Sequence, residues 1–292
     1  MFFGGGDKVS IEIDPGQGPF YPGSPLNVSI TLRSKKKVKV SEVRAVLLFH
    51  EQYRYKAVEE DDDGDRQTRV YTAHKDWEVH KDLLMGGETI PGGFEQTYQL
   101  DWKIPEDAQP PYPGKVIQAK WLIKVTLDRK LRKDINKEIE LPVIVPPPGT
   151  HGGAGEYGHA SHSDKADMQL WLPRVEWVEG ETIEGKLKIY AHDNISCNHV
   201  RIELTRKEEV FRENGNVFTV TEFKERISGG VKLRAGETSE IPFSVAIPKK
   251  GCPTLDTPVG RVTWTLKGIL SRRLRKDFTV TQEIFVYNGS KA

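Results

Sequence analysis

Apolar and polar residues alternate along much of this chain. In the stretch 26–32 every second residue is apolar, and the same alternation runs through 98–104 and 119–127. It returns at 183–189 and 262–270, with glycine at one position of each. A period of two is typical of β-strands that bury one face. No stretch shows a capped 3.6-residue period, and 27 Gly and 18 Pro punctuate the chain. The pattern therefore predicts an all-β protein.

A long internal repeat divides the chain into two similar halves. The hexapeptide RKLRKD at 129–134 returns as RRLRKD at 272–277, an offset of 143 residues. At the same offset Trp121 falls on Trp264. Further upstream the offset is 157, since 42–51 aligns with 199–208, so one half carries a 14-residue insertion. A repeat of this size predicts two copies of one fold.

The length of 292 residues also suggests two domains. We expect two tandem antiparallel immunoglobulin-like β-sandwiches, at 1–145 and 166–288. Between them lies a Pro/Gly/His-rich linker, 146–165, whose prolines stiffen the exit from the first domain and whose later part should be a flexible tether. Residues 289–292 form a short tail.

Charge and targeting signals indicate a cytoplasmic protein. The 43 Lys and Arg balance 42 Asp and Glu, for a net charge of +1, so no global field favours nucleic acid as a partner. We find no signal peptide, no lipid-anchor motif and no apolar run long enough for a transmembrane segment. A peripheral location at membranes stays open.

Two cysteines, Cys197 and Cys252, are too few for a disulfide framework. They fit buried thiols in a reducing compartment. A catalytic thiol is the alternative interpretation.

Each basic hexapeptide separates two alternating strands, so it should lie at a hairpin connection. One interpretation is a solvated turn that keeps sheet edges apart. The other is a surface that binds anions or partners, such as phosphoinositide head groups or phosphorylated tails, with weak contact to anionic lipid. Packing of Leu131 and Leu274 would turn some of the charges inward. The candidate residues are Arg129, Lys130, Arg132, Lys133, Arg272, Arg273, Arg275 and Lys276.

Other clusters of polar residues match no known site. His151, His159 and His162 in the linker invite a zinc interpretation but lack the fixed spacing of supported ligands. The acidic run 59–65 fails the calcium-loop pattern, because Arg66 stands where glycine is required. No catalytic constellation emerges, so we expect no enzyme activity, no cofactor and no metal.

The six tryptophans could instead form a sugar-stacking platform. Trp102, Trp121 and Trp264 fall on the apolar phase of their strands, where an aromatic residue is normally core. The pattern does not assign the other three, Trp77, Trp171 and Trp177, to the core or to the surface.

The chain resembles the arrestin-like family. Both halves open with a turn and an alternating strand, FYPGSPLNVSITL and WVEGETIEGKLKI. Both close with an Ile-Pro, a proline-bearing loop, a glycine, a long strand, a charged turn and a last strand, in the order found in arrestins, α-arrestins, the retromer subunit of arrestin fold and bacterial sporulation-control proteins. The resemblance implies an N-type and a C-type arrestin sandwich.

In function, the resemblance implies a non-enzymatic intracellular adaptor or scaffold. Such a protein binds other proteins, including cytosolic tails of membrane proteins, in trafficking or signalling. The alternative is a ligand- or carbohydrate-binding β-sandwich module.

Two family features have no match in this sequence. The phosphate-sensing arginine of receptor-regulating arrestins is missing, and the last strand of the first half offers Glu138 and Glu140 instead. The PPxY motif of α-arrestins is one residue short at Pro110-Pro111-Tyr112.

Overall fold

The computed structural model describes residues 9–60, 66–130, 132–149, 153–160, 164–212 and 214–290. These residues form strands, turns and loops, and they include no helix. A helix with the length and apolarity needed to cross a membrane is accordingly not found among them. The predicted all-β class is confirmed.

Contacts group the chain into two compact units that are interleaved in sequence, so far as their residues are described. Unit 1 comprises Met1–Gln52, Ala73–Pro111 and Gln118–Ile144, and unit 2 comprises Tyr53–Thr72, Tyr112–Ile117 and Val145–Ala292. The linker boundaries expected from the sequence stay a prediction.

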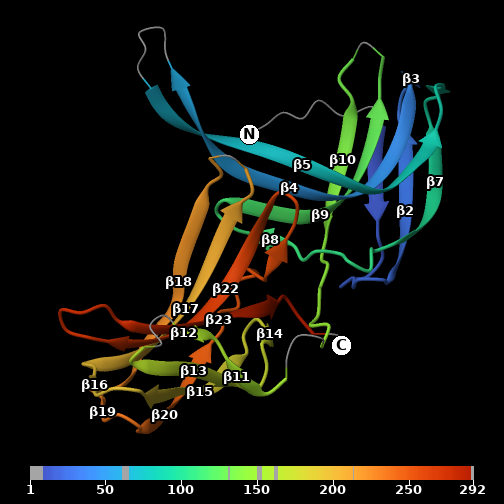
Figure 1. Ribbon diagram of the computed structural model, residues 1–292. Helices are drawn as coiled ribbons and strands as arrows, with labels where there is room; N and C mark the ends of the chain where they lie inside the picture. Colours follow the sequence, from blue (N-terminus) through green and yellow to red (C-terminus); the bar gives the residue numbers. More distant parts are fainter. Residues whose placement is uncertain are drawn as a thin grey trace, which may run out of the picture. The chain divides into compact units, whose positions relative to one another are not determined.

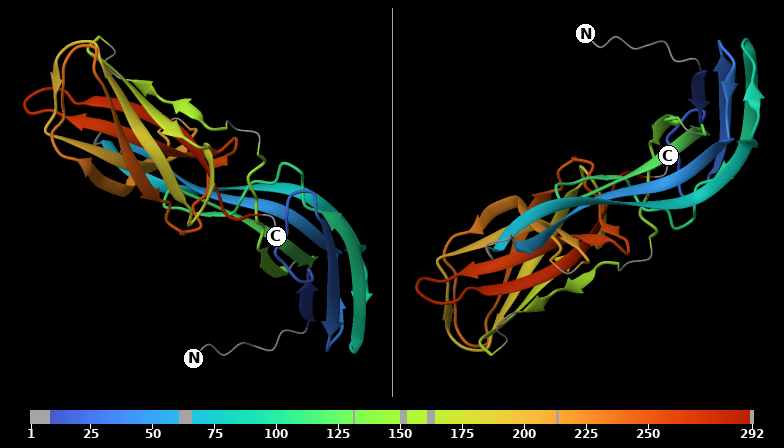
Figure 2. Two further views of the ribbon diagram at one scale, coloured as in Figure 1. Left: turned by 90° about the horizontal axis from the view of Figure 1, so that it is seen from below. Right: turned by 90° about the horizontal axis from the view of Figure 1, so that it is seen from above.

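The first sandwich has a sheet of order β1-β2-β7 and a second sheet of order β10-β9-β4-β5. Strands β2 and β7 run side by side over ten residues, from Pro25 opposite Lys103 to Ser34 opposite Phe94 (Figure 2). The strands are β1 (Val9–Asp14), β2 (Pro25–Ser34), β3 (Val38–Lys39), β4 (Glu42–Glu60), β5 (Arg66–Met85), β6 (Thr89–Ile90), β7 (Phe94–Lys103), β8 (Tyr112–Pro113), β9 (Ile117–Asp128) and β10 (Ile135–Leu141).

The second sandwich has a sheet of order β11-β13-β15-β20 and a sheet of order β12-β23-β22-β17-β18 (Figure 1). Its strands are β11 (Gly155–Tyr157), β12 (His159–Ala160), β13 (Ala166–Leu172), β14 (Glu176–Val178), β15 (Thr182–Ala191), β16 (Ile195–Ser196), β17 (His199–Val210), β18 (Val217–Ser228), β19 (Lys232–Leu233), β20 (Thr238–Ala246), β21 (Leu255–Asp256), β22 (Gly260–Ser271) and β23 (Phe278–Tyr287).

The two sandwiches repeat one strand order, which confirms the predicted duplication of the fold. Strands β1, β2 and β7 correspond to β13, β15 and β20, and β10-β9-β4-β5 corresponds to β23-β22-β17-β18. Trp121 and Trp264 lie on the equivalent strands β9 and β22, and both are buried. Their indole N–H groups donate to backbone oxygens at the same offset, Gln109 at 2.8 Å and Cys252 at 3.0 Å.

The 14-residue insertion lies in the β4–β5 hairpin. Strands β4 and β5 have 19 and 20 residues, whereas the equivalent β17 and β18 have 12 each. Figure 1 shows β4 and β5 as long neighbouring strands. Their outer part, 53–72, is the part that groups with unit 2.

The alternation of apolar and polar residues determines which residues form the core. In β2, the apolar residues Leu26, Val28, Ile30 and Leu32 are all fully buried, while the residues between them are more exposed. Burial of one apolar side chain contributes about 1.5–3 kcal/mol. The alternating pattern therefore fixes which face of each strand points inward.

Part of the expected tether is ordered. Strand β11 pairs with β13, and β12 pairs with β23. The expectation of a tether without regular structure does not hold for these five residues, because sheet edges offer unpaired backbone groups that a short extended segment can satisfy.

Candidate functional site

The first and last residues of each basic hexapeptide hold its turn together. The backbone N–H of Arg129 donates to Asp134 at 3.1 Å, and that of Arg272 donates to Asp277 at 2.9 Å. In both turns the arginine Nε also donates to the carbonyl oxygen of the fifth residue at 2.8 Å. The duplicated sequence therefore encodes a duplicated turn.

The charges between these two residues point into solvent. In the first turn these are Lys130, Arg132 and Lys133, and in the second they are Arg273, Arg275 and Lys276, all exposed. Leu274 is 96% exposed, so it does not turn the neighbouring charges inward. Leu131, the equivalent residue, lies outside the described residues.

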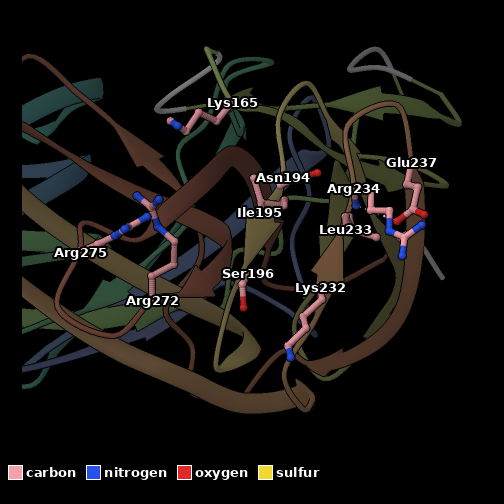
Figure 3. Close-up of a pocket in the computed structure, with 10 residues that line it drawn as sticks. All are labelled: Lys165, Asn194, Ile195, Ser196, Lys232, Leu233, Arg234, Glu237, Arg272 and Arg275. Atoms are coloured by element: carbon pink, nitrogen blue, oxygen red, sulfur yellow. Dashed lines mark hydrogen bonds between the residues drawn. The ribbon is translucent and has the colours of Figure 1, made fainter.

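The second turn borders a cleft at one end of the second sandwich (Figure 3). The cleft has a volume of about 660 Å³, and Arg272 and Arg275 lie on one side of it. Lys232, Arg234 and Glu237 lie on the other side. The remaining lining residues are Lys165, Asn194, Ile195, Ser196 and Leu233. Three separate parts of unit 2 thus bring cations to one place.

The lining of the cleft carries five cations and one carboxylate. Lys165 is paired with Asp193 at 3.0 Å. Within the described part of the chain, no carboxylate pairs with the side chains of Lys232, Arg234 or Arg275. The cleft therefore has an excess of positive charge that is not neutralised locally.

Unit 1 has a groove between β1 and β10. It has a volume of about 430 Å³ and is lined by Val9, Ser10, Ile11, Lys35, Ile135, Asn136 and Lys137. Both strands are the end strands of their sheets. Along 9–14 and 135–141, no other described strand pairs with their outer sides.

The equivalent edges of the second sandwich are covered by the segment 155–160. Gly155 to Tyr157 pair with β13, and His159 and Ala160 pair with β23. Gly158 connects β11 to β12 and has a φ of +106°. A Cβ atom at this position would come within 2.5 Å of Val280. The carboxylate of Glu156 accepts from Lys188 at 2.7 Å. One extended segment therefore spans both sheets of this sandwich.

A buried ion network lies elsewhere in unit 2. Arg206 pairs with Glu208 at 2.7 Å and with Glu222 at 3.0 Å, and it donates to the Tyr112 hydroxyl. Lys250 pairs with Glu222 at 2.6 Å. Burial alone would raise the pKa of Glu222, but the hydrogen bonds from Lys250 and Arg206 outweigh it and lower that pKa.

Glu208 of this network and a separate carboxylate, Glu179, each accept two backbone N–H groups. Glu208 accepts the backbone N–H groups of Val116 at 2.7 Å and Ile117 at 3.3 Å. Glu179 accepts those of Gly251 and Cys252, at 3.0 and 2.5 Å. Burial raises the pKa of Glu179, although these N–H groups partly offset the effect. The two carboxylates thus hold the backbone at 116–117 and 251–252 in place.

Neither thiol is set up as a nucleophile. Cys197 and Cys252 are free and buried, and burial raises the pKa of both. A catalytic cysteine needs a lowered pKa and access to substrate. Both residues behave instead as small buried side chains.

The described residues contain no group of three or more His, Cys, Asp or Glu side chains that could hold a metal ion. His151 and His162 lie outside the described residues, and His159 belongs to β12. Most of the acidic run, 61–65, also lies outside them.

Most of the tryptophans are core residues. Trp102, Trp121, Trp177 and Trp264 are buried. Trp77 donates its indole N–H to buried Glu51 at 2.5 Å and lies beneath Lys75. This placement gives no support to a sugar-stacking platform.

Sequence reasoning found Arg272 and Arg275 but missed Lys165, Lys232 and Arg234. These three come from other segments of the chain, and nothing in their local sequence indicates a shared cleft. The structural role of Arg272 did have a signal, because Arg and Asp keep the same spacing in both hexapeptides.

Two family models match the chain. Residues 6–148 match the model described as arrestin (or S-antigen), C-terminal domain, and residues 163–278 match that of the SpoOM protein. No curated protein matches the chain. The two matches fall on the two copies of the fold, and the second fits the sporulation-control type of arrestin-like protein. The chain belongs to the arrestin-like family.

Proposed function

We propose that this protein is a non-enzymatic intracellular adaptor that captures an extended segment of a partner protein in the groove between β1 and β10. Membership in the arrestin-like family suggests an adaptor-type role. The buried thiols with raised pKa support a role without catalysis. The groove suggests where the partner segment binds and which side chains it carries.

The observation that carries the proposal is a difference between the two copies. In the second sandwich the segment 155–160 covers the edges of β13 and β23. In the first sandwich the equivalent strands β1 and β10 have no such cover among the described strands. Unpaired N–H and C=O groups at a sheet edge bind another strand through main-chain hydrogen bonds.

The charge of the groove indicates what kind of segment fits. Lys35 and Lys137 are exposed, and they are the only ionisable residues among those that line the groove in the described structure. An extended segment with carboxylate or phosphate side chains complements them. Cytosolic tails of membrane proteins can supply such segments, and trafficking or signalling is the setting we propose.

A selection experiment tests this function. Purified protein is used to select peptides from a random display library, and amide exchange is then measured with the selected peptides bound. We expect protection in 9–14 and 135–141, and weaker binding by the variant K35E/K137E.

The matched control is K39E/K249E, which changes the net charge equally at two exposed lysines outside the groove. Selected peptides that protect only other strands would contradict the proposal. Equal losses in the two variants would do so as well.

A further inference from the structure

We infer that the cleft of the second sandwich is a binding site for a small group that carries two or more phosphates, either as a free molecule or as a lipid headgroup. The site does not depend on the proposed groove, because every residue that lines it belongs to the stretch 165–275 of unit 2.

The first argument is charge. Four of the five cations, Lys232, Arg234, Arg272 and Arg275, have no carboxylate partner within the described residues, and the lining adds only Glu237 against them. Closely placed cations repel one another unless an anion or water lies between them. Several phosphate oxygens on one small ligand would satisfy them together.

The second argument is the fixed position of Arg272. Its Nε and Nη2 both donate to the carbonyl of Lys276, and its guanidinium lies 3.8 Å from the ring centre of Phe278. These contacts use two of the five N–H donors of an arginine and leave three. A planar donor held in place loses little conformational entropy when it binds phosphate.

The third argument is size. A volume of about 660 Å³ lies within the range of small-molecule sites, roughly 300–1,000 Å³. Ser196 adds a hydroxyl group between the two cationic sides (Figure 3). A compact ligand can therefore reach both sides of the cleft.

The fourth argument comes from the other copy of the fold. The pairing of β16 with β19 matches that of β3 with β6, so Lys232 corresponds to Thr89 and Arg234 to Pro91. In the first copy a lysine, Lys39, lies on the other strand of this pair, opposite Thr89. The fold therefore does not require cations at the positions of Lys232 and Arg234, and binding of an anion gives a reason for them.

Calorimetry with inorganic tripolyphosphate at low ionic strength tests the site, since salt screens exposed charges. We expect one site per chain, with affinity reduced at least about tenfold in K232Q/R275Q. The control K130Q/R132Q removes two charges from the equivalent turn of the first copy and should bind as the wild type does. All four side chains are exposed, so the melting temperature reports that each variant folds.

A second arm identifies the source of the phosphates. Phosphatidylcholine vesicles with phosphatidylinositol bisphosphate are compared with phosphatidylserine vesicles of equal surface charge. Stronger binding to the bisphosphate vesicles, lost in K232Q/R275Q, indicates a headgroup. Binding of tripolyphosphate alone indicates a soluble ligand.

Three results would overturn the inference. One is no binding of either probe by the wild type. Another is equal weakening in both variants, and the last is equal, measurable binding to the two kinds of vesicle, since both indicate diffuse attraction rather than a site.

Discussion

At the scale of single residues, the two copies differ most clearly beside the duplicated tryptophan. Phe49 packs against Trp121 with ring centres 5.1 Å apart, and the equivalent residue in the second copy, Arg206, lies 5.9 Å from the ring centre of Trp264. A buried charge is costly unless it is paired and hydrogen-bonded. The carboxylates around Arg206 therefore offset the cost of burying its charge.

Replacing this arginine should destabilise the protein strongly. Arg206→Met removes the guanidinium that pairs with the buried side chains of Glu208 and Glu222, and Glu222 then keeps only its ion pair with Lys250. We expect a loss of about 3–5 kcal/mol in the free energy of unfolding, measured in urea. Lys207→Met, at the neighbouring exposed ion pair, should change it by less than about 0.5 kcal/mol. A loss below about 1 kcal/mol in Arg206→Met would show that the network contributes little.

Acid should weaken the same network. The pKa of Glu222 is lower in the folded protein than its ordinary value, so the unfolded chain binds the proton more tightly. The stabilisation by Glu222 is therefore present above the unfolded pKa of about 4.3 and is lost as pH falls through the folded pKa.

The measurement is the free energy of unfolding of wild type and Glu222→Gln between neutral pH and pH of about 3. Wild type should lose more stability than the variant over this range. Other carboxylates titrate in both proteins, so the difference reports Glu222. Parallel curves would show that its charge does not stabilise the fold.

At the scale of elements, some charged residues of the duplicated turn hold its backbone in place and others are exposed to solvent. Asp134 and Asp277 accept the backbone N–H of the first arginine, while Lys133 and Lys276 are exposed. Asp134→Ala and Asp277→Ala should each cost about 1.5–3 kcal/mol, as the loss of a hydrogen bond to a charged group does. Lys133→Ala and Lys276→Ala should have little effect on the melting temperature. If the aspartate variants melt like the lysine variants, the turn does not depend on these bonds.

The sequence predicted the strands well because period-two alternation reflects burial of one sheet face. It also indicated where the copies diverge, since the shift of 14 residues corresponds to the longer β4–β5 hairpin. Strands β11 and β12 were not predicted. Glycine, glutamate and alanine have low strand propensity, and the segment forms strands only because the edges of β13 and β23 pair with it.

Contacts between segments that are distant in the chain could not be predicted from the sequence either. Tyr112 contacts Arg206 across 94 positions of the chain, and the cations of the cleft come from three separate segments. Neither has a local pattern, because side chains from different segments meet only once the sheets are in place.

At the scale of the whole molecule, the chain contains two copies of one fold, and the two copies have different surfaces. Among the described strands, none pairs with the outer edges of β1 and β10 in the first copy, whereas the second copy has the segment 155–160 across the equivalent edges and a cationic cleft. Duplication relaxes the constraint on each copy, so one surface can serve the partner segment and the other an anion.

Amide hydrogen exchange of the free protein tests the central claim most directly, because it compares equivalent edges within one chain. Exchange is followed in 9–14 against 166–172, and in 135–141 against 278–284. Backbone groups that are hydrogen-bonded in a stable sheet exchange slowly, and those at an open edge exchange fast. We predict that the outer amides of β1 and β10 exchange faster than their equivalents on β13 and β23. Equal protection of both pairs would mean that the edges of the first sandwich are already covered, which contradicts the account.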